Sequence, residues 1–111
     1  MKDILSLLAQ DSYFIVNKDL AKVIGINEAI ILGELASEYT YYLKNDKLTE
    51  DGYFYSTVKN IEDNTTIKRD KQRKILNHLQ DLDLIDIKLK ETPAKRFIKL
   101  NKNNIFKLFE S

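Results

Sequence analysis

The sequence TTIKRDKQRKILNHLQDLDLIDIKL, residues 65–89, decides the fold. Five cations lie within the seven residues from Lys68 to Lys74, and an apolar run with helical spacing follows them. Residues 84–89 then alternate between apolar and polar faces, which predicts a half-buried strand. The pattern therefore predicts a helix over about 68–81 that is basic at its start and leads directly into a strand. Its predicted buried residues are Ile75, Leu76 and Leu79, with Leu82 just beyond them.

A short helix and a long helix are predicted ahead of this stretch. Residues 12–16 form a short β-prone run, and Asn17 is a good N-cap for a helix that ends at Gly25. From Asn27 onward, apolar residues at helical spacing predict a long helix packed on a core. Its apolar stripe consists of Ile30, Ile31, Leu35, Ala36, Tyr39, Tyr42 and Leu43. Residues 1–11 are expected to form an additional N-terminal helix.

A strand and a short helix are predicted before the basic helix, and a hairpin and a further helix are predicted after it. A turn at Gly52 precedes a strand over 53–57, and Ser56 or Thr57 caps a short helix over 58–63. After the basic helix, the strand 84–89 turns at 91–93 and pairs with an antiparallel strand over 96–100. Residues 101–111 are expected to form an amphipathic C-terminal helix that carries Ile105, Phe106, Leu108 and Phe109.

This order of elements predicts an α+β fold that is mainly α. It is a winged helix-turn-helix with a C-terminal β-hairpin wing and additional N- and C-terminal helices. We expect one domain over 1–111, with the helix-turn-helix at 57–81 and the wing hairpin at 84–100.

Composition restricts the possible functions. A chain of 111 residues suffices for one domain with a modest core, and no apolar run approaches the roughly 18 residues that cross a bilayer. The start, MKDILSLLAQ, lacks the build of a secretory signal, so a cytoplasmic location is expected. With no cysteine and one histidine, disulfides, thiol nucleophiles and ordinary zinc sites are excluded. No phosphate-cradling glycine motif is present, and we expect neither an enzyme nor a cofactor.

Charge is divided unequally between the two halves. Residues 1–56 carry 5 lysines against 9 carboxylates, a balance of −4, whereas residues 57–111 carry 13 cations against 8 carboxylates, a balance of +5. The second half therefore provides the electropositive surface, although the net charge of the whole chain is only +1.

The basic helix is a candidate DNA-recognition helix. Helix-turn-helix modules place their second helix in the major groove, with its first residues nearest to the bases. With Ile75 at the centre of the buried face, Arg69, Asp70, Arg73, Lys74 and Asn77 are predicted on the outer side. Arginine can bridge O6 and N7 of guanine, and the helix N-terminus favours anions. The predicted contacts to double-stranded DNA are Lys68, Arg69, Arg73, Lys74 and Asn77 on the helix, Thr57, Lys59, Thr65 and Thr66 around the turn, and Lys90, Lys95 and Arg96 on the hairpin, with Ser56 and Asn60 as weaker phosphate donors.

These cations also have a plainer interpretation. Surface lysines and arginines usually keep a helix soluble, and Asp70 can pair with Arg73 or Lys74 and cancel part of their field. For the hairpin cations, the alternative role is to keep an edge strand soluble. The position of the basic run, after a short helix and a tight turn and before a basic hairpin, favours DNA binding.

Three other groups are interpreted as structural. Glu34 and Glu38 lie four residues apart on the long helix and are expected to form a solvated acidic face, because no histidine or third ligand accompanies them. His78 is expected at the boundary of the buried face. A cluster of rings could suggest base stacking, but its periodicity places it mostly in the core and at the core rim. This cluster consists of Tyr39, Tyr41, Tyr42, Tyr53, Phe54 and Tyr55.

Taken together, these segments resemble a known family. The segments YFIVNKDLAKVIGINEAIILGELASEY, DGYFYSTVKNIEDNTTIKRDKQRKILNHLQDLDLIDIKL and PAKRFIKLN cover roughly residues 12–102. They are similar to the N-terminal winged-helix domain of replication initiators and replisome organisers of Gram-positive phages and plasmids, which are related to the DnaD primosome proteins. The most specific pieces are DGYFYST, KRDKQRK and PAKRFIKL.

The resemblance implies recognition of origin DNA and assembly of the replisome, without catalysis. Two positions depart from the family pattern. Lys68 replaces the serine that usually opens the recognition helix, so the N-cap role falls to Thr66 or is lost, at a cost of up to about 1 kcal/mol. Asp83 replaces the usual glycine after this helix and is expected in a left-handed conformation. The family's second domain has no counterpart in these 111 residues, so an excised domain and a stand-alone protein both stay open.

Partners other than DNA are expected at the two ends of the chain. The segments ILSLLA at 4–9 and IFKLF at 105–109 are too apolar for free tails, which predicts a homodimer through the terminal helices. Replisome or helicase-loader proteins are further expected partners, and no membrane partner is expected. A transcriptional regulator with the same fold, and a winged helix that binds proteins instead of DNA, are the alternatives.

Overall fold

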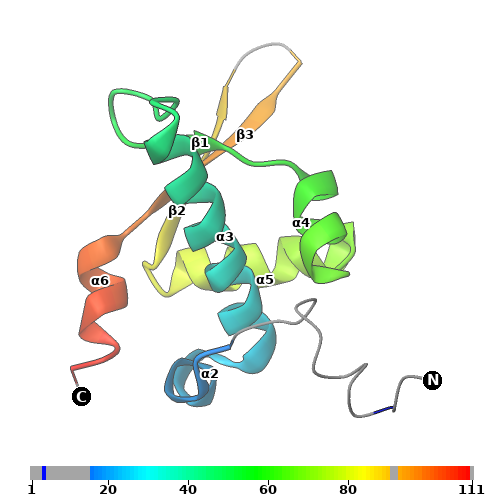
Figure 1. Cartoon of the computed structure of the whole chain (residues 1–111), viewed down its shortest axis with the longest axis vertical. Helices are drawn as coiled ribbons and strands as arrows, with labels where there is room; N and C mark the ends of the chain where they lie inside the picture. Colours follow the sequence, from blue (N-terminus) through cyan, green and yellow to red (C-terminus); the bar gives the residue numbers. More distant parts are fainter. Residues whose placement is uncertain (1–3, 5–15, 91–92, 111) are drawn as a thin grey trace.

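The computed structural model describes residue 4 and residues 16–90 and 93–110. The helix predicted over 1–11 and the β-prone run predicted over 12–16 fall almost wholly outside these residues. The described elements, in chain order, are α2 (Lys18–Ile24), α3 (Ile26–Lys44), β1 (Phe54–Tyr55), α4 (Val58–Thr65), α5 (Arg69–Asp81), β2 (Ile85–Lys90), β3 (Lys95–Leu100) and α6 (Lys102–Lys107) (Figure 1). This order and the sheet topology below confirm the predicted winged helix-turn-helix, with α4 and α5 as the helix pair and β2 and β3 as the wing.

The first two helices begin and end as the sequence predicts. The side chain of Asn17 accepts a hydrogen bond of 2.9 Å from the N–H of Leu20 and thereby caps α2. Gly25 has a φ of 104°, which separates α2 from α3, and its N–H donates to the carbonyl of Ala21. The long helix starts at Ile26, one residue before its predicted start.

The turn between α4 and α5 is held by side chains. The Thr57 hydroxyl accepts the N–H of Asn60 and caps α4, and Thr66 ends this helix with a left-handed φ of 67°. Gln72 is fully buried, and its amide donates to the carbonyls of Val58 (3.0 Å) and Ile67 (2.7 Å). This glutamine ties the start of α4 and the turn to α5, so the angle between the two helices is set by polar contacts as well as by packing.

The two departures from the family pattern have different outcomes. Lys68 occupies the N-cap position of α5 and makes no side-chain capping hydrogen bond, so side-chain capping is lost at this helix start. Asp83 adopts the expected left-handed conformation, with a φ of 63°.

The sheet has three antiparallel strands in the order β1-β3-β2. Phe54 of β1 and Ile87 of β2 both pair with Ile98 of β3, and this row faces the helices. The hairpin of β2 and β3 continues past this row and projects away from the helices, at the top of Figure 1.

The core lies between the inner face of the sheet and the helices α3, α4 and α5. The side chains of Ile31, Leu35, Phe54, Ile61 and Leu79 have no exposed area. Burial of each contributes roughly 1.5–3 kcal/mol to the free energy of unfolding, so this shared core fixes the position of α5.

Several exposure predictions are wrong. The alternation over 84–89 predicts Leu89 on the same buried side as Ile85, but Leu89 is 71% exposed, because β2 at this point has passed the helices that cover Ile85. Ala36 and Leu43 of the predicted stripe are exposed too. The C-terminal helix runs over Lys102–Lys107, and within its predicted apolar group Ile105 and Leu108 pack on the core, whereas Phe106 and Phe109 are exposed.

Candidate nucleic-acid interface

The first turns of α5 present a dense basic surface. The predicted outward positions are confirmed, because Arg69, Arg73, Lys74 and Asn77 are exposed while Gln72 on the opposite side is buried. We call the cations of this surface the α5 basic patch; they are Lys68, Arg69, Lys71, Arg73 and Lys74, all exposed. Their contact with DNA stays a prediction.

Little in the surroundings neutralises the α5 basic patch. Asp70 lies 3.9 Å from the guanidinium of Arg73, with both side chains more than two-thirds exposed. Such a solvated pair contributes little and is easily exchanged for a phosphate. Among the described residues, no ion pair involves Arg69 or Lys74. The unpaired N–H groups of the helix start add to the same positive potential.

The turn before α5 supplies fewer phosphate donors than predicted. Thr66 is exposed next to Lys68, and Thr57 is half-buried with its oxygen engaged in the α4 cap. Lys59 is exposed and forms an ion pair of 2.7 Å with Asp63. The assignment of Thr65 is wrong, because this residue is 4% exposed. Its hydroxyl donates to the carbonyl of Ile61 and accepts the N–H of Ile67, as a residue that shapes the turn.

Of the three predicted wing cations, Lys95 is exposed and Lys90 is half-buried. Lys90 and Lys95 pair with each other across β2 and β3 on the side of the sheet that faces away from the helices. Arg96 is half-buried and lies on the inner side instead, a placement that does not favour the predicted DNA contact. Its Nε donates to the carbonyl of Ser56 at 3.1 Å, and burial lowers its pKa, against the attraction of Glu38. Arg96 therefore connects the wing to the start of the helix-turn-helix.

Glu38 forms part of the same internal network, so the predicted solvated acidic face is wrong at this residue. Glu38 is 9% exposed, and the hydroxyl of the buried Ser56 donates to its Oε1 at 2.9 Å. Ser56 is thus also excluded as a phosphate donor. Burial and the nearby Glu34 raise the pKa of Glu38 to about 8, against the Ser56 hydrogen bond and Arg96, which lower it. The signal for burial was its spacing, because Glu38 continues the buried positions Ile31 and Leu35 at i+7 and i+3.

The remaining polar groups have structural roles. Glu34 accepts a hydrogen bond from the amide of Asn64, which connects α3 to α4. The Nδ1 atom of His78 lies 3.1 Å from Oε1 of Glu28, so this boundary residue connects α5 to α3. Among the residues that the structure describes, no group of three or more His, Asp or Glu side chains could hold a metal ion.

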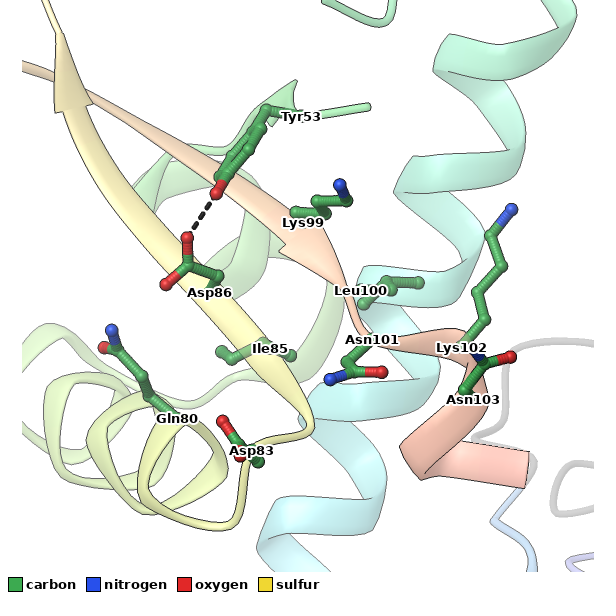
Figure 2. A pocket seen from close by; sticks show the side chains of 10 residues that line it. All are labelled: Tyr53, Gln80, Asp83, Ile85, Asp86, Lys99, Leu100, Asn101, Lys102 and Asn103. Atoms are coloured by element: carbon green, nitrogen blue, oxygen red, sulfur yellow. Dashed lines mark hydrogen bonds between the residues drawn. The ribbon is translucent and has the colours of Figure 1, made fainter. Parts of the chain in front are cut away.

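A hollow of about 700 Å³ opens where α5, β2, β3 and α6 meet (Figure 2). Tyr53 lies at one side of this hollow, and its hydroxyl donates to the carboxylate of Asp86. Lys99 and Lys102 line the side formed by β3 and α6. This hollow lies outside the α5 basic patch.

An apolar surface is exposed at the opposite end from the wing, where α2 and the C-terminal segment meet (Figure 1). Val23 is 59% exposed, and Phe109 is 49% exposed; both line a hollow of about 300 Å³. Phe106 on α6 is 64% exposed. No helix among the described residues is long and apolar enough to span a bilayer.

Comparisons with known proteins bear on the fold. The chain matches no protein-family model, and no curated protein resembles it in sequence. A solved structure of the N-terminal domain of a DNA-binding protein has the same fold, with a TM-score of 0.64 and 17% sequence identity over 99% of this chain and 92% of that chain. Because the identity is low, this likeness supports the fold alone: the chain is a winged helix-turn-helix domain.

Proposed function

We propose that this protein binds double-stranded DNA, with the start of α5 in the major groove and the wing on the adjacent backbone. The observation that carries this proposal is the α5 basic patch, in which five exposed cations surround one carboxylate at the start of the second helix of the pair. That position is where helix-turn-helix modules meet base edges and phosphates. The likeness to a domain of a DNA-binding protein is consistent with it.

The roles of individual residues follow from their placement. Arg69 and Arg73 are the candidates for contacts to guanine, because both are exposed on the outer side of α5. Lys68, Lys74 and Thr66 are the candidates for phosphate contacts, and Lys90 and Lys95 are the wing candidates. Thr65, Ser56 and Arg96 hold the module together and are not part of the proposed surface.

The more specific role that we propose is recognition of a replication origin in a phage or plasmid, followed by recruitment of replisome proteins. This step rests on the resemblance of DGYFYST, KRDKQRK and PAKRFIKL to the replication-initiator family. The role is binding and recruitment, without catalysis. A transcriptional regulator would use the same surface and would differ in the sites that it occupies.

Duplex binding is tested by fluorescence anisotropy on a random duplex and a matched single strand at about 50 and 200 mM salt. Binding to the duplex is expected to weaken by an order of magnitude or more over this range, since each neutralised phosphate releases counterions. Arg69→Ala/Arg73→Ala is expected to weaken binding and reduce the salt dependence, whereas the control Lys44→Ala/Lys107→Ala, which removes two exposed cations elsewhere, is not. Equal effects of the two double variants would show that the α5 basic patch is only a solvated face.

We also propose that the chain forms a homodimer through exposed hydrophobic residues of α2 and the C-terminal segment, because Val23, Phe106 and Phe109 are all about half exposed or more. Sedimentation is expected to show a dimer that Phe106→Ser/Phe109→Ser dissociates. A single species of 13.0 kDa at high micromolar concentration would contradict this proposal.

A further inference from the structure

The side of the sheet that faces away from the helices combines aromatic rings with lysines. Because the Phe54–Ile98 pair faces the core, the adjacent Tyr55–Phe97 pair faces the other way. Lys88 pairs with Phe97, Lys90 with Lys95 and Asp86 with Lys99 on this same side. We call this surface the outer sheet face; it consists of Tyr55, Asp86, Lys88, Lys90, Lys95, Phe97 and Lys99.

The two rings form a pair that ammonium groups cover. The ring centroids of Tyr55 and Phe97 lie 5.7 Å apart with a tilt of 40°, and Tyr55 is 37% exposed. The Nζ atom of Lys90 lies 5.3 Å from the Phe97 centroid, and that of Lys95 lies 5.7 Å from the Tyr55 centroid. These cation–π contacts keep four flexible side chains at one place on the sheet. A ligand with flat rings and negative groups could stack on the two aromatic rings and pair with the two ammonium groups, and so replace these contacts.

The described part of the outer sheet face carries more cations than carboxylates. Four lysines lie on it, and two carboxylates among the described residues stand near them. One carboxylate, Asp51, forms an ion pair with Lys88 at 3.3 Å, and the other, Asp86, accepts the Tyr53 hydroxyl. Among the described residues, neither Lys90 nor Lys99 forms an ion pair, so these two lysines leave a cationic excess along the strands.

The outer sheet face continues into the hollow of about 700 Å³ described above. Lys99 belongs to both, and Lys102 stands beyond it on the same side (Figure 2). The carboxylates of Asp83 and Asp86 line the other side of the hollow. A negatively charged backbone would therefore follow β3 and α6, and its bases would point toward the rings and the hollow.

We propose that the outer sheet face binds single-stranded nucleic acid, with bases stacked on the Tyr55–Phe97 pair and phosphates bound by Lys90 and Lys99. Aromatic rings beside a cationic track are the arrangement that unpaired bases require, since each base must offer a free face for stacking. A duplex keeps its base faces covered and can use only the lysines. The outer sheet face is thus a second nucleic-acid surface. Its rings and Lys99 lie outside the proposed duplex surface, whereas Lys90 and Lys95 of the wing belong to both, so the rings and Lys99 distinguish the two proposals.

Tryptophan fluorescence tests this proposal, because the native chain contains no tryptophan. Tyr55→Trp places a single reporter in the ring pair, and Ala36→Trp places a control reporter at an exposed position on α3. On titration with a thymidine oligonucleotide of about 15 nucleotides, quenching is expected for Tyr55→Trp and not for Ala36→Trp. Adding Lys99→Gln to Tyr55→Trp is expected to weaken binding about tenfold, whereas adding Arg69→Ala/Arg73→Ala should change it less than about twofold.

Any one of four results would overturn the proposal. Two concern the quenching itself: equal quenching of both reporters, or no quenching at tens of micromolar oligonucleotide. The other two concern the ligand: tighter binding of a matched duplex to the Tyr55→Trp site, or competition by polyglutamate as strong as that by an unlabelled oligonucleotide. The last result would indicate a surface for acidic proteins. Circular dichroism of each variant shows that loss of binding is not loss of folding, and Lys99→Gln alone, at an exposed position, provides a variant that leaves the rings intact. Failure of the duplex proposal would give a different result: Arg69→Ala/Arg73→Ala would bind duplex DNA as the native protein does.

Discussion

Replacing Glu38 by glutamine is expected to change how the stability of this domain depends on pH. The pKa of Glu38 is raised from 4.5 to about 8, chiefly by burial. Between these two values the folded state holds a proton that the unfolded state has released. Stability contributed by this group therefore falls as the pH rises from the unfolded pKa to the folded pKa, and is constant outside that range.

The magnitude follows from the slope of this linkage. One proton of difference corresponds to about 1.4 kcal/mol for each pH unit, so the free energy of unfolding should fall by roughly 3 kcal/mol between pH 5 and pH 7 through this group. Glutamine fits the same space: its carbonyl can accept from Ser56, and its NH₂ group replaces Oε2, which has no hydrogen-bond partner among the described residues. The neutral variant has no proton to lose, so its advantage over the native protein should grow with pH.

Urea denaturation followed by circular dichroism, at intervals from about pH 5 to pH 9, measures this difference directly. Glu38→Gln and the native protein should be similar near pH 5, and the variant should be the more stable by roughly 3 kcal/mol at pH 7. Glu50→Gln, at an exposed carboxylate, serves as the control and should follow the native profile. Parallel profiles for Glu38→Gln and the native protein would refute the reasoning that a buried, protonated carboxyl joins α3 to Ser56 at the start of the helix-turn-helix.

Three further substitutions test the packing and the turn by the same denaturation assay. Phe54→Ala removes a ring with no exposed area and is expected to destabilise the domain by about 3–5 kcal/mol; a loss below about 1 kcal/mol would contradict the assigned core. Gln72→Leu leaves the carbonyls of Val58 and Ile67 without their buried donor and is expected to destabilise by about 2 kcal/mol or more, which a neutral result would contradict. Lys68→Ser adds a capping hydroxyl at the start of α5 and should stabilise by up to about 1 kcal/mol, whereas a loss of stability would indicate that Lys68 already serves this helix end.

The order of elements could be predicted because periodicity and caps are local signals. Asn17, Gly25 and Thr57 define helix ends through their own side chains or backbone, and the structure places the boundaries at these residues. The outward side of α5 followed in the same way from the buried position of Ile75.

Polar residues between elements could not be assigned in this way. Arg96 and Glu38 approach Ser56 from β3 and α3, and this network exists only once the three segments are packed together. The predicted burial of Leu89 is wrong for a related reason. Alternation predicts which side of a strand a residue faces, but it does not predict how far along the strand the covering helices extend. The outer sheet face was missed because Tyr55 and Phe97 lie far apart in sequence and meet only through the strand register.

The position of the DNA on the domain is the central claim, and amide chemical shifts measured by nuclear magnetic resonance test it most directly. On titration with a duplex at about 50 mM salt, the largest shift changes should cluster at residues 66–77 and at the wing residues Lys90 and Lys95, and should diminish as salt is raised. Changes in α2 and α6 should be small, because neither helix contributes a residue to the proposed duplex surface and both lie at the opposite end of the domain from the wing (Figure 1). Shift changes confined to α2 and α6, or none at saturating duplex, would contradict the assignment of α5 as the recognition helix.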